Sequence, residues 1–235
     1  MITIKNLYLK FIREYFALYD INLKIAENES VAFLGESESG KTSLIRILAK
    51  VEKMTSGEVY IKDIPLKKIN YACDISVGYL PEKPVFFEKK TVYENLKWAL
   101  KVQKTKKLEI ESKINDALMN FQLESLKDVK IKQLSLYEKY LVSLARLSFR
   151  KLDLLLIDDI FVNLDFNQQS DIKEILKKFF VGKCTFVLAT SNEEIAKSLC
   201  KKWVRFQSGS IIEENVKKNE KEKKWNWMWK LRTRN

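Results

Sequence analysis

Residues 35–43 read GESESGKTS, and this stretch constrains the fold more than any other feature of the chain. It fits the phosphate-binding pattern Gly-x-x-x-x-Gly-Lys-Ser/Thr through Gly35, Gly40, Lys41 and Thr42. The apolar run VAFL precedes it, and the helix-like segment SLIRILAK follows it. We therefore expect a strand, a phosphate-binding loop and a helix in direct succession. The alternative is a Gly-Ser surface turn before an amphipathic helix.

The chemistry of such a loop points to one class of ligand. Successive backbone N–H groups and a helix N-terminus are directed at one spot, which suits phosphate oxygens. Lys41 would add a positive charge for the outer phosphates, and the Thr42 hydroxyl would hold Mg²⁺. The expected occupant is a nucleoside triphosphate with its magnesium ion.

Composition excludes several other classes of protein. With 46% hydrophobic residues, the chain can bury a substantial core. Its apolar runs fall short of the ~18 residues of a membrane span and its N-terminus is unlike a signal peptide, so we expect a cytosolic chain. Cys73, Cys184 and Cys200 are too widely spaced for a disulfide framework or a zinc site, and we expect reduced core residues. The absence of histidine excludes histidine bases and ligands.

A formal net charge of +12 favours an acidic partner, either nucleic acid or the anionic face of a membrane. A generally lysine-rich proteome would explain most of this charge equally well. In the tail, Trp225, Trp227 and Trp229 stand among lysine and arginine residues. Because tryptophan favours membrane interfaces and partner grooves, the tail predicts such a contact, or else it folds back on its own domain.

Strand-like and helix-like segments alternate, which is typical of a mostly parallel sheet with helices on both faces. Over about residues 88–150 the pattern is helical, and Thr91 and Glu94 have capping-box spacing. We therefore expect an α/β fold with a helical subdomain inserted into it. The expected strands are Ile2–Leu9, Ile21–Ile25, Val31–Leu34, Glu58–Ile61, Ser76–Leu80, Asp153–Ile157 and Thr185–Ala189, and helices are expected from Lys41 and over Phe166–Phe179.

An acidic motif later in the chain supplies the carboxylate that a phosphate loop needs to hold Mg²⁺. The apolar run LLLI is followed by Asp158 and Asp159, which places two acids at the carboxyl edge of the sheet. Asp158 is the expected carboxylate for Mg²⁺. Asp159 is expected on the other side of the chain, where it would orient or deprotonate an attacking water. The alternative is a pair of acids that cap the following segment.

Residues 1–214 resemble the ATP-binding subunits of the ABC transporter family, with the matching motifs in the same order along the chain. Phe11, seven residues before Leu18, stands where that family places an aromatic that stacks on adenine. The resemblance implies a P-loop NTPase of ABC type with a small antiparallel β part, an inserted helical subdomain, and a basic, Trp-rich tail at residues 215–235. The other matching segments are SGEVYI, VGYLPE, TVYENL, LSLYEKYLVSLARL, LLLIDDIFVNLD and TFVLATSNEE.

Three departures from the family fall in the implied catalytic site. Glu38 replaces a glycine of the phosphate loop, which places a bulky anion close to the triphosphate and weakens binding. Glu82 replaces a glutamine, although a carboxylate can still coordinate the metal. Asp159 replaces a glutamate and withdraws the carboxylate by about 1.5 Å. Because a displacement of about 1 Å can cost on the order of a hundredfold in rate, slow hydrolysis is expected.

Two further departures affect contacts with the γ-phosphate. The family signature Leu-Ser-Gly-Gly-Gln, which grips ATP on the opposite subunit, reads LSLYE at residues 134–138, so bulk and charge replace glycine. Ser135 and Glu138 instead match a capping box. Ser191 replaces the switch histidine, and its side chain is too short to reach the γ-phosphate equivalently. With Glu194, Ser191 matches an ordinary helix cap.

The resemblance assigns roles to individual residues. Asp159 and Glu82 are the expected catalytic residues, and Thr42, Asp158 and Glu82 are the expected Mg²⁺ ligands. The residues expected to bind ATP are Phe11, Gly35, Glu36, Ser37, Glu38, Ser39, Gly40, Lys41, Thr42, Ser43, Ser135 and Ser191.

The implied function is coupling of ATP binding and slow hydrolysis to conformational change in separate membrane-spanning subunits. The chain would pair with a like or unlike ATP-binding subunit at the cytoplasmic face of the cell membrane. Phe86 and Phe87 would contact the membrane subunit or pack the helical subdomain. The alternative is a catalytically impaired pseudo-ATPase with a regulatory or scaffold role. A nucleic-acid-associated ABC ATPase is disfavoured, because such proteins usually carry two ATPase halves in one chain.

Overall fold

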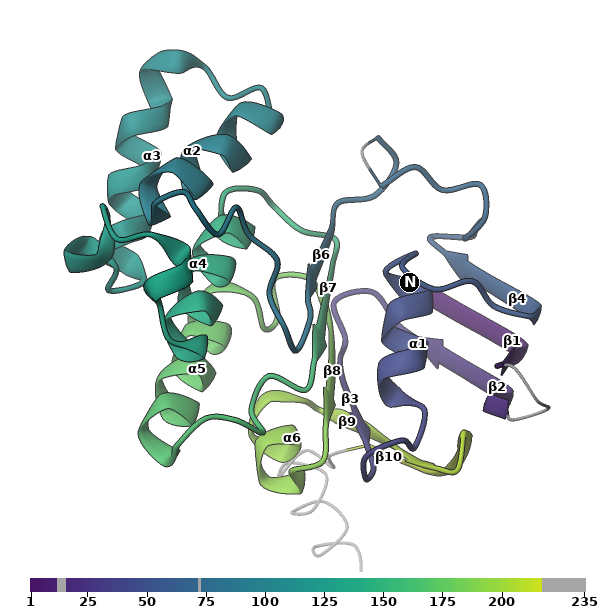
Figure 1. Cartoon of the computed structure of the whole chain (residues 1–235). Coiled ribbons are helices and arrows are strands. Elements are labelled where there is room, and N and C mark those ends of the chain that lie inside the picture. Colours follow the sequence, from purple (N-terminus) through teal and green to yellow (C-terminus); the bar gives the residue numbers. More distant parts are fainter. Residues whose placement is uncertain (12–15, 72, 217–235) are drawn as a thin grey trace, which may run out of the picture.

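The computed structural model describes residues 1–11, 16–71 and 73–216, and the strands of these residues form one sheet of six and one of four (Figure 1). The strands are β1 (Ile2–Lys10), β2 (Phe16–Ile25), β3 (Ser30–Leu34), β4 (Ser56–Ile61), β5 (Ile64–Pro65), β6 (Val77–Leu80), β7 (Leu154–Asp158), β8 (Thr185–Thr190), β9 (Lys202–Gln207) and β10 (Ser210–Val216). The helices are α1 (Lys41–Leu48), α2 (Val92–Val102), α3 (Lys107–Asn120), α4 (Leu136–Ser148), α5 (Phe166–Phe179) and α6 (Glu193–Leu199), with short 3-10 turns at Glu124–Leu126 and Ile131–Gln133.

The larger sheet has the order β10-β9-β3-β8-β7-β6. Its strands run parallel from β9 to β6, and β10 returns antiparallel to β9. The smaller sheet, of order β2-β1-β4-β5, is antiparallel throughout. This topology confirms the expected α/β fold with a mostly parallel sheet and a small antiparallel part.

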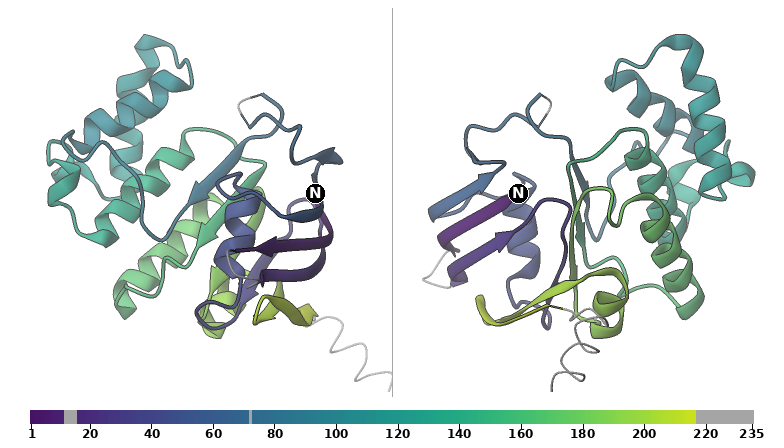
Figure 2. Two further views of the ribbon diagram at one scale, coloured as in Figure 1. Left: turned by 45° about the vertical axis from the view of Figure 1, so that its right-hand side comes forward. Right: turned by 180° about the vertical axis from the view of Figure 1, so that it is seen from behind.

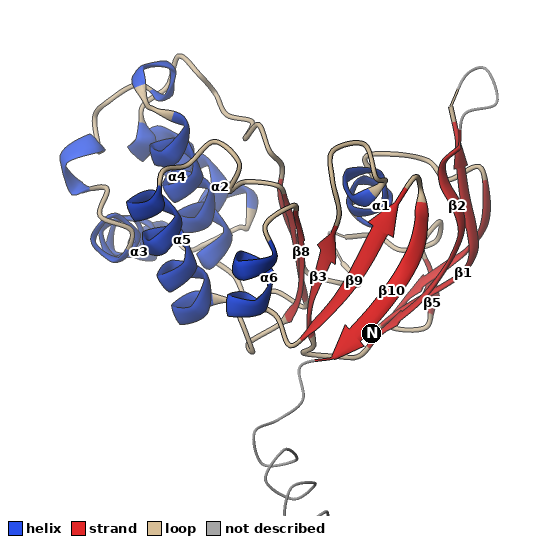
Figure 3. Cartoon of the chain, turned by 90° about the horizontal axis from the view of Figure 1, so that it is seen from below, coloured by secondary structure: helices blue, strands red, loops and turns tan. Residues whose placement is uncertain are grey.

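Both faces of the larger sheet are covered, as Figure 3 shows. Helices α2 to α6 lie on one face, and α1 with the antiparallel sheet lies on the other. Along β7, Leu155 and Ile157 enter the first core, whereas Leu154 and Leu156 enter the second, as strand alternation requires. This double coverage explains why central strands such as β3, β7 and β8 are buried over their whole length.

Helices α2, α3 and α4 are inserted between β6 and β7 and stand away from the antiparallel sheet (Figure 2). Thr91 and Glu94 form the expected capping box: Glu94 N–H donates to Thr91 Oγ1 at 3.1 Å, and Thr91 N–H donates to Glu94 Oε2 at 2.8 Å. The three helices pack on one another as well as on the sheet. We propose that residues 88–150 act as a subdomain within an ATP-binding domain of residues 1–214.

The structure also differs from the expectations at several points. Strand β2 begins at Phe16 rather than Ile21, because its pairing with β1 extends to the Lys10–Phe16 pair. Strands β9 and β10 were not expected, although they add an edge to the larger sheet. Cys184 and Cys200 are buried, but Cys73 is exposed, so its assignment to the core is wrong.

Two expectations concern the membrane. Among the residues that the structure describes, no helix combines the length and the apolar character of a membrane span. The Trp-rich part of the tail, with Trp225, Trp227 and Trp229, lies outside the described residues.

Candidate nucleotide-binding site

The loop between β3 and α1 depends on a glycine at its end. Gly40 is the residue before the helix and has φ +105°, which favours glycine. A Cβ atom there would lie 2.7 Å from the carbonyl oxygen of Ala17 and 2.9 Å from Leu18 Cδ2. No side chain caps the helix at this position, so its first N–H groups remain open toward the cavity.

Lys41 reaches back into the loop that precedes it. Its side chain is buried, and Nζ donates to the carbonyl oxygens of Gly35 at 2.8 Å and Glu36 at 2.6 Å. Burial lowers the pKa of Lys41, whereas the carboxylates of Asp159 and Asp158 oppose that shift. The ammonium group is therefore held between the loop and the acidic end of β7.

Thr42 joins the start of α1 to the end of β7. Its Oγ1 donates to Asp158 Oδ1 at 2.8 Å. Burial is the main cause that raises the pKa of Asp158; the hydrogen bond from Thr42 and the charge of Lys41 lower it, and the charges of Asp159 and Glu82 raise it further. A hydroxyl beside a carboxylate is an oxygen-rich pair of the type that Mg²⁺ prefers.

The charges of Lys41 and Glu82 act on the carboxylates of both Asp158 and Asp159, so the two acids face the same groups and the expectation that Asp159 points to the other side is wrong. Strand β7 ends at Asp158, and Asp159 has φ +47°, so strand alternation no longer applies to it. Its Oδ1 is buried and, within the described chain, has no hydrogen-bond partner. Burial raises the pKa of Asp159, Lys41 lowers it, and Glu82 raises it. A buried acceptor without a donor points to a ligand or cation in this place.

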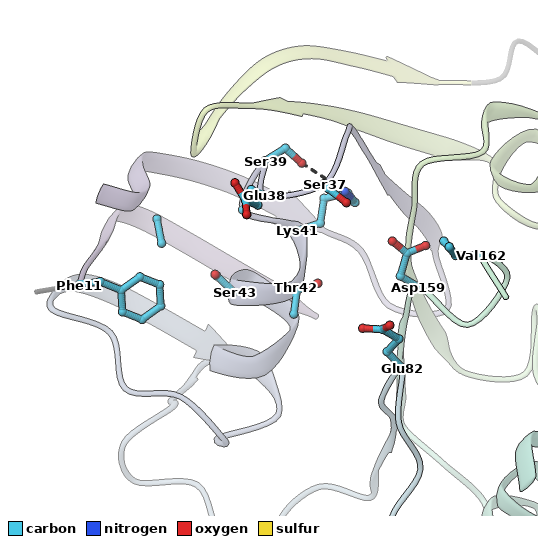
Figure 4. A pocket seen from close by; sticks show the side chains of 12 residues that line it. Phe11, Ser37, Glu38, Ser39, Lys41, Thr42, Ser43, Glu82, Asp159 and Val162 are labelled. Atoms are coloured by element: carbon cyan, nitrogen blue, oxygen red, sulfur yellow. Dashed lines mark hydrogen bonds between the residues drawn. The ribbon is translucent and has the colours of Figure 1, made fainter. Parts of the chain in front are cut away.

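These side chains surround one cavity of about 480 Å³, a size typical of small-molecule sites (Figure 4). In Figure 4, Asp159 and Glu82 extend toward the loop from one side, and Phe11, 47% exposed, stands at the far end. The lining residues are Phe11, Ala17, Ser37, Glu38, Ser39, Gly40, Lys41, Thr42, Ser43, Glu82, Asp159 and Val162.

The donors fit Mg²⁺ only together with phosphate. Among the described residues, no three acidic or sulfur-bearing side chains are arranged to hold a metal ion alone. Mg²⁺ in nucleotide sites is bound by one or two protein carboxylates together with substrate phosphates and water. Thr42 and Asp158 share a hydrogen bond, and Glu82 lines the same cavity as Thr42, so these three residues fit that description.

Ser191 lies apart from this group. It is exposed and lines a second cavity of about 620 Å³ together with Gly35, Glu36 and Arg205; this cavity shares Ser37, Glu38 and Ser39 with the first. Ser191 does not cap α6: Asn192 does, because its Oδ1 accepts the N–H groups of Glu194 and Ile195 at 2.9 and 3.1 Å. The expected cap by Ser191 is therefore wrong.

Ser135 lines neither cavity and caps α4 as expected. Glu138 N–H donates to Ser135 Oγ at 3.2 Å, and Glu138 Oε2 accepts both Ser135 N–H at 2.7 Å and Ser135 Oγ–H at 2.8 Å. The Glu138 carboxylate thus occupies the N-terminus of α4.

Several residues of the two cavities were not expected from the sequence; besides those described here, Phe206, Gln207, Ser208 and Ile212 line the second. Ala17 reaches the first cavity because β2 lies against the loop, and Val162 follows the acidic pair by three residues. Arg205 lines the second cavity, where Glu193 and Glu213 hold its guanidinium at 3.0 and 3.3 Å. The positions of Ala17 and Arg205 depend on strand order, for which a local pattern carries no signal.

Comparison with known proteins agrees with this site. Residues 18–162 match the family model of the ABC transporter. The spermidine/putrescine import ATP-binding protein PotA of Legionella pneumophila is 31% identical over 203 residues, which cover 83% of this chain and 53% of that protein. The sulfate/thiosulfate import ATP-binding protein CysA of Halalkalibacterium halodurans is 33% identical over 200 residues, which cover 83% of this chain and 56% of that protein. The chain spans about half the length of the curated relatives it matches.

A solved structure shares the same arrangement of elements. A bacterial ABC transporter cassette, determined as a dimer, has a TM-score of 0.83 and 25% identity over 93% of this chain and 100% of that chain. The family match covers more than half of the sequence and includes the phosphate loop and the acidic end of β7. The chain belongs to the ABC transporter family and is one of its ATP-binding cassettes.

Proposed function

We propose that this chain is an ATP-binding subunit that couples ATP binding and slow hydrolysis to conformational change in separate membrane-spanning subunits. The observation that carries the proposal is the convergence of Lys41, Thr42, Asp159 and Glu82 on one cavity at the N-terminus of α1. A helix N-terminus with open N–H groups and a lysine suits the triphosphate.

The residues around the cavity would have distinct roles. Lys41 and the loop N–H groups bind the phosphates, and Phe11 stacks on the base. Thr42, Asp158 and Glu82 hold Mg²⁺, which would neutralise charge on the phosphates when bound. Asp159 would orient or deprotonate the attacking water, and its uncompensated Oδ1 is free to accept that proton or hydrogen bond.

The proposed partners are membrane-spanning subunits and a second ATP-binding subunit, like or unlike this one, at the cytoplasmic face of the cell membrane. Support comes from relatives whose names describe import ATP-binding proteins, and from the dimeric cassette. In such a dimer, Ser135 and Ser191 would face the nucleotide of the partner and of this chain respectively. The Trp-rich tail would add a contact with the membrane surface, and nucleic acid is not among the proposed partners.

A second function, that of a pseudo-ATPase with a regulatory or scaffold role, is favoured by the N-terminus of α4. There the Glu138 carboxylate already accepts two hydrogen bonds where the phosphate of a partner's nucleotide would dock. Two anions at one helix end repel each other. Binding of ATP without turnover would be the result.

The decisive experiment is calorimetric titration with ATP and Mg²⁺, together with steady-state phosphate release. Lys41→Ala should weaken ATP binding on the order of 10- to 100-fold, because charged hydrogen bonds contribute about 1.5–3 kcal/mol. Lys113→Ala, which removes a half-buried lysine paired with Glu109 on α3, is the matched control and should bind normally. ATP binding that is unchanged in Lys41→Ala would refute the proposed function.

Turnover separates the two functions. If the short reach of Asp159 limits hydrolysis, Asp159→Glu should raise phosphate release up to about a hundredfold without changing ATP affinity. Tight binding with no turnover in either protein, alone or with candidate partners, would favour the pseudo-ATPase.

A further inference from the structure

The segment that follows β6 brings Glu82 to the nucleotide cavity, and a tyrosine of α4 holds it there. The side chain of Glu82 lines the cavity, whereas its main-chain carbonyl faces the helices. Tyr140 Oη–H donates to that carbonyl oxygen at 2.6 Å. Tyr140 belongs to the second turn of the helix that Ser135 caps.

The same helix holds the segment at two further points. Arg146 Nη1 donates to the carbonyl oxygen of Val85 at 3.2 Å, and its guanidinium lies 4.7 Å from the centroid of the Phe86 ring. Lys139 forms an ion pair with Glu88 at 3.3 Å. Helix α4 and residues 82–88 are therefore linked at three points, with Tyr140 nearest to the cavity.

Tyr140 is suited to hold a backbone group rigidly. Its side chain is completely buried in the core between the helices and the sheet, which restricts the movement of the hydroxyl. Burial raises its pKa, and the carboxylates of Glu82, Asp159 and Asp158 raise it further. The hydroxyl thus remains a neutral donor and stands within the electrostatic reach of all three acids.

We propose that Tyr140 is a positioning residue of the magnesium site: its hydroxyl fixes the backbone of Glu82 and transmits displacements of α4 to the Glu82 carboxylate. This inference rests on the proposed function, because it requires Mg²⁺ and ATP in the cavity. The mechanism is mechanical, since Tyr140 reaches the ion only through Glu82. A shift of α4, whose N-terminus would meet a partner subunit, would then alter how well this chain holds the metal.

The test uses the contribution of the metal to ATP binding. ATP dissociation constants are measured with EDTA and with Mg²⁺, and the EDTA value divided by the Mg²⁺ value reports the contribution of the metal to binding. Tyr140→Phe should lower that ratio about 3- to 10-fold, the effect of one lost hydrogen bond, and leave the EDTA value unchanged. Tyr93→Phe is the matched control: Tyr93 Oη–H donates to Glu111 Oε2, also at 2.6 Å but on the far helices, and its loss should change neither constant.

A double-mutant cycle shows whether the effect passes through Glu82. In a Glu82→Ala background, Tyr140→Phe should produce no further change in the ratio, because the positioned ligand is gone. An undiminished effect in that background would overturn the inference. The inference would also be overturned if Tyr140→Phe left the ratio unchanged while Lys41→Ala weakened ATP binding as expected. If Lys41→Ala did not weaken ATP binding, the proposed function would be overturned as well.

Hydrogen exchange of the unmodified chain provides an independent measurement if Tyr140→Phe does not fold. Adding Mg²⁺ to the ATP-bound protein should slow exchange in residues 82–88 and in α4 together, because the two are linked. Slower exchange in residues 82–88 without any change in α4 would overturn the inference.

Discussion

At the scale of single residues, the nucleotide cavity contains backbone conformations that its side chains disfavour. Glu38 has φ +62° and Asp159 has φ +47°, both in the left-handed region. Such a conformation costs a residue with a Cβ on the order of 1–2 kcal/mol, and aspartate tolerates it better than glutamate does. Both residues line the cavity, so its shape is maintained at the expense of stability.

Glu38 allows this cost to be measured. Glu38→Gly should raise the free energy of unfolding by about 0.5–1 kcal/mol, because relief of strain exceeds the added entropy of the unfolded chain. It should also tighten ATP binding, since a negative charge is removed from the loop. Glu38→Gln is the matched control: it removes only the charge, so ATP binding should tighten without a gain in urea-unfolding stability. Equal stability of the two variants would contradict the strain argument.

Asp159 predicts a dependence of stability on pH. Its folded pKa lies above the ordinary value of 3.8, so the folded chain binds this proton more tightly than the unfolded chain does. The group therefore opposes folding above its folded pKa, and the penalty disappears as the pH falls below 3.8.

Asp159→Asn should accordingly stabilise the nucleotide-free chain at neutral pH by up to about 1 kcal/mol, with a gain that vanishes toward about pH 3. Urea unfolding across this pH range measures the difference. Asp116→Asn, at an exposed position on α3, should stay within about 0.5 kcal/mol of the wild type. A gain for Asp159→Asn that persists at low pH would show that charge is not its cause.

At the scale of elements, the helices differ in how they begin. Side chains of Thr91, Ser135, Asp165 and Asn192 cap α2, α4, α5 and α6. Gly40 precedes α1 without a side-chain cap, and α3 likewise has no side-chain cap at its start. Because a cap satisfies the first N–H groups, its absence at α1 leaves them available to phosphate, whereas the cap at α4 closes that helix end.

The cap of α4 should contribute measurably to stability. Ser135→Ala should lower the free energy of unfolding by about 1 kcal/mol, within the range of about 0.5–2 kcal/mol for such caps. Ser148→Ala makes the same change at the other end of the helix, where Ser148 Oγ–H donates to the carbonyl of Ala145, and should cost less than about 0.5 kcal/mol. Equal losses in the two variants would argue against a special role of the capping box.

At the scale of the whole molecule, the phosphate loop is the place where the two sheets meet. Gly209, in the turn between β9 and β10, donates its N–H to the carbonyl of Ser39 at 3.1 Å and accepts from Tyr19 N–H of β2 at 2.8 Å. Gly40 packs against Ala17 of β2 and against Gly209. The loop is therefore held by both sheets at once, and its geometry depends on their packing.

Substitutions at two glycines distinguish the stability cost of a packing clash from that of backbone strain. Gly40→Ala should lower the free energy of unfolding by about 2 kcal/mol or more, because it adds a backbone clash to an unfavourable φ. Gly182→Ala also has a positive φ, +77°, but a Cβ there would meet nothing within 4 Å, so its cost should be only about 1 kcal/mol. Thermal or urea unfolding of both variants provides the measurement, and equal losses would contradict the packing argument.

Local patterns in the sequence were sufficient for much of the fold. The run LLLI before Asp158 predicts a buried strand because both of its faces are apolar, and β7 begins one residue from the expected start. Helix α5 spans Phe166–Phe179, as its apolar period indicates. The direction of the Asp159 side chain could not be predicted in this way, because its left-handed backbone breaks the alternation on which the expectation was based.

By itself, the sequence determined the phosphate loop, the acidic end of β7, the family and the chemical type of each donor, because these depend on neighbouring residues. Only the tertiary structure decided which donors meet. Thr42 reaches Asp158 across 116 positions of the chain, because α1 packs against β7. Tyr140 reaches Glu82 across 58 positions, because α4 packs against β6. Contacts between such distant residues arise from strand order and packing, which are properties of the whole chain.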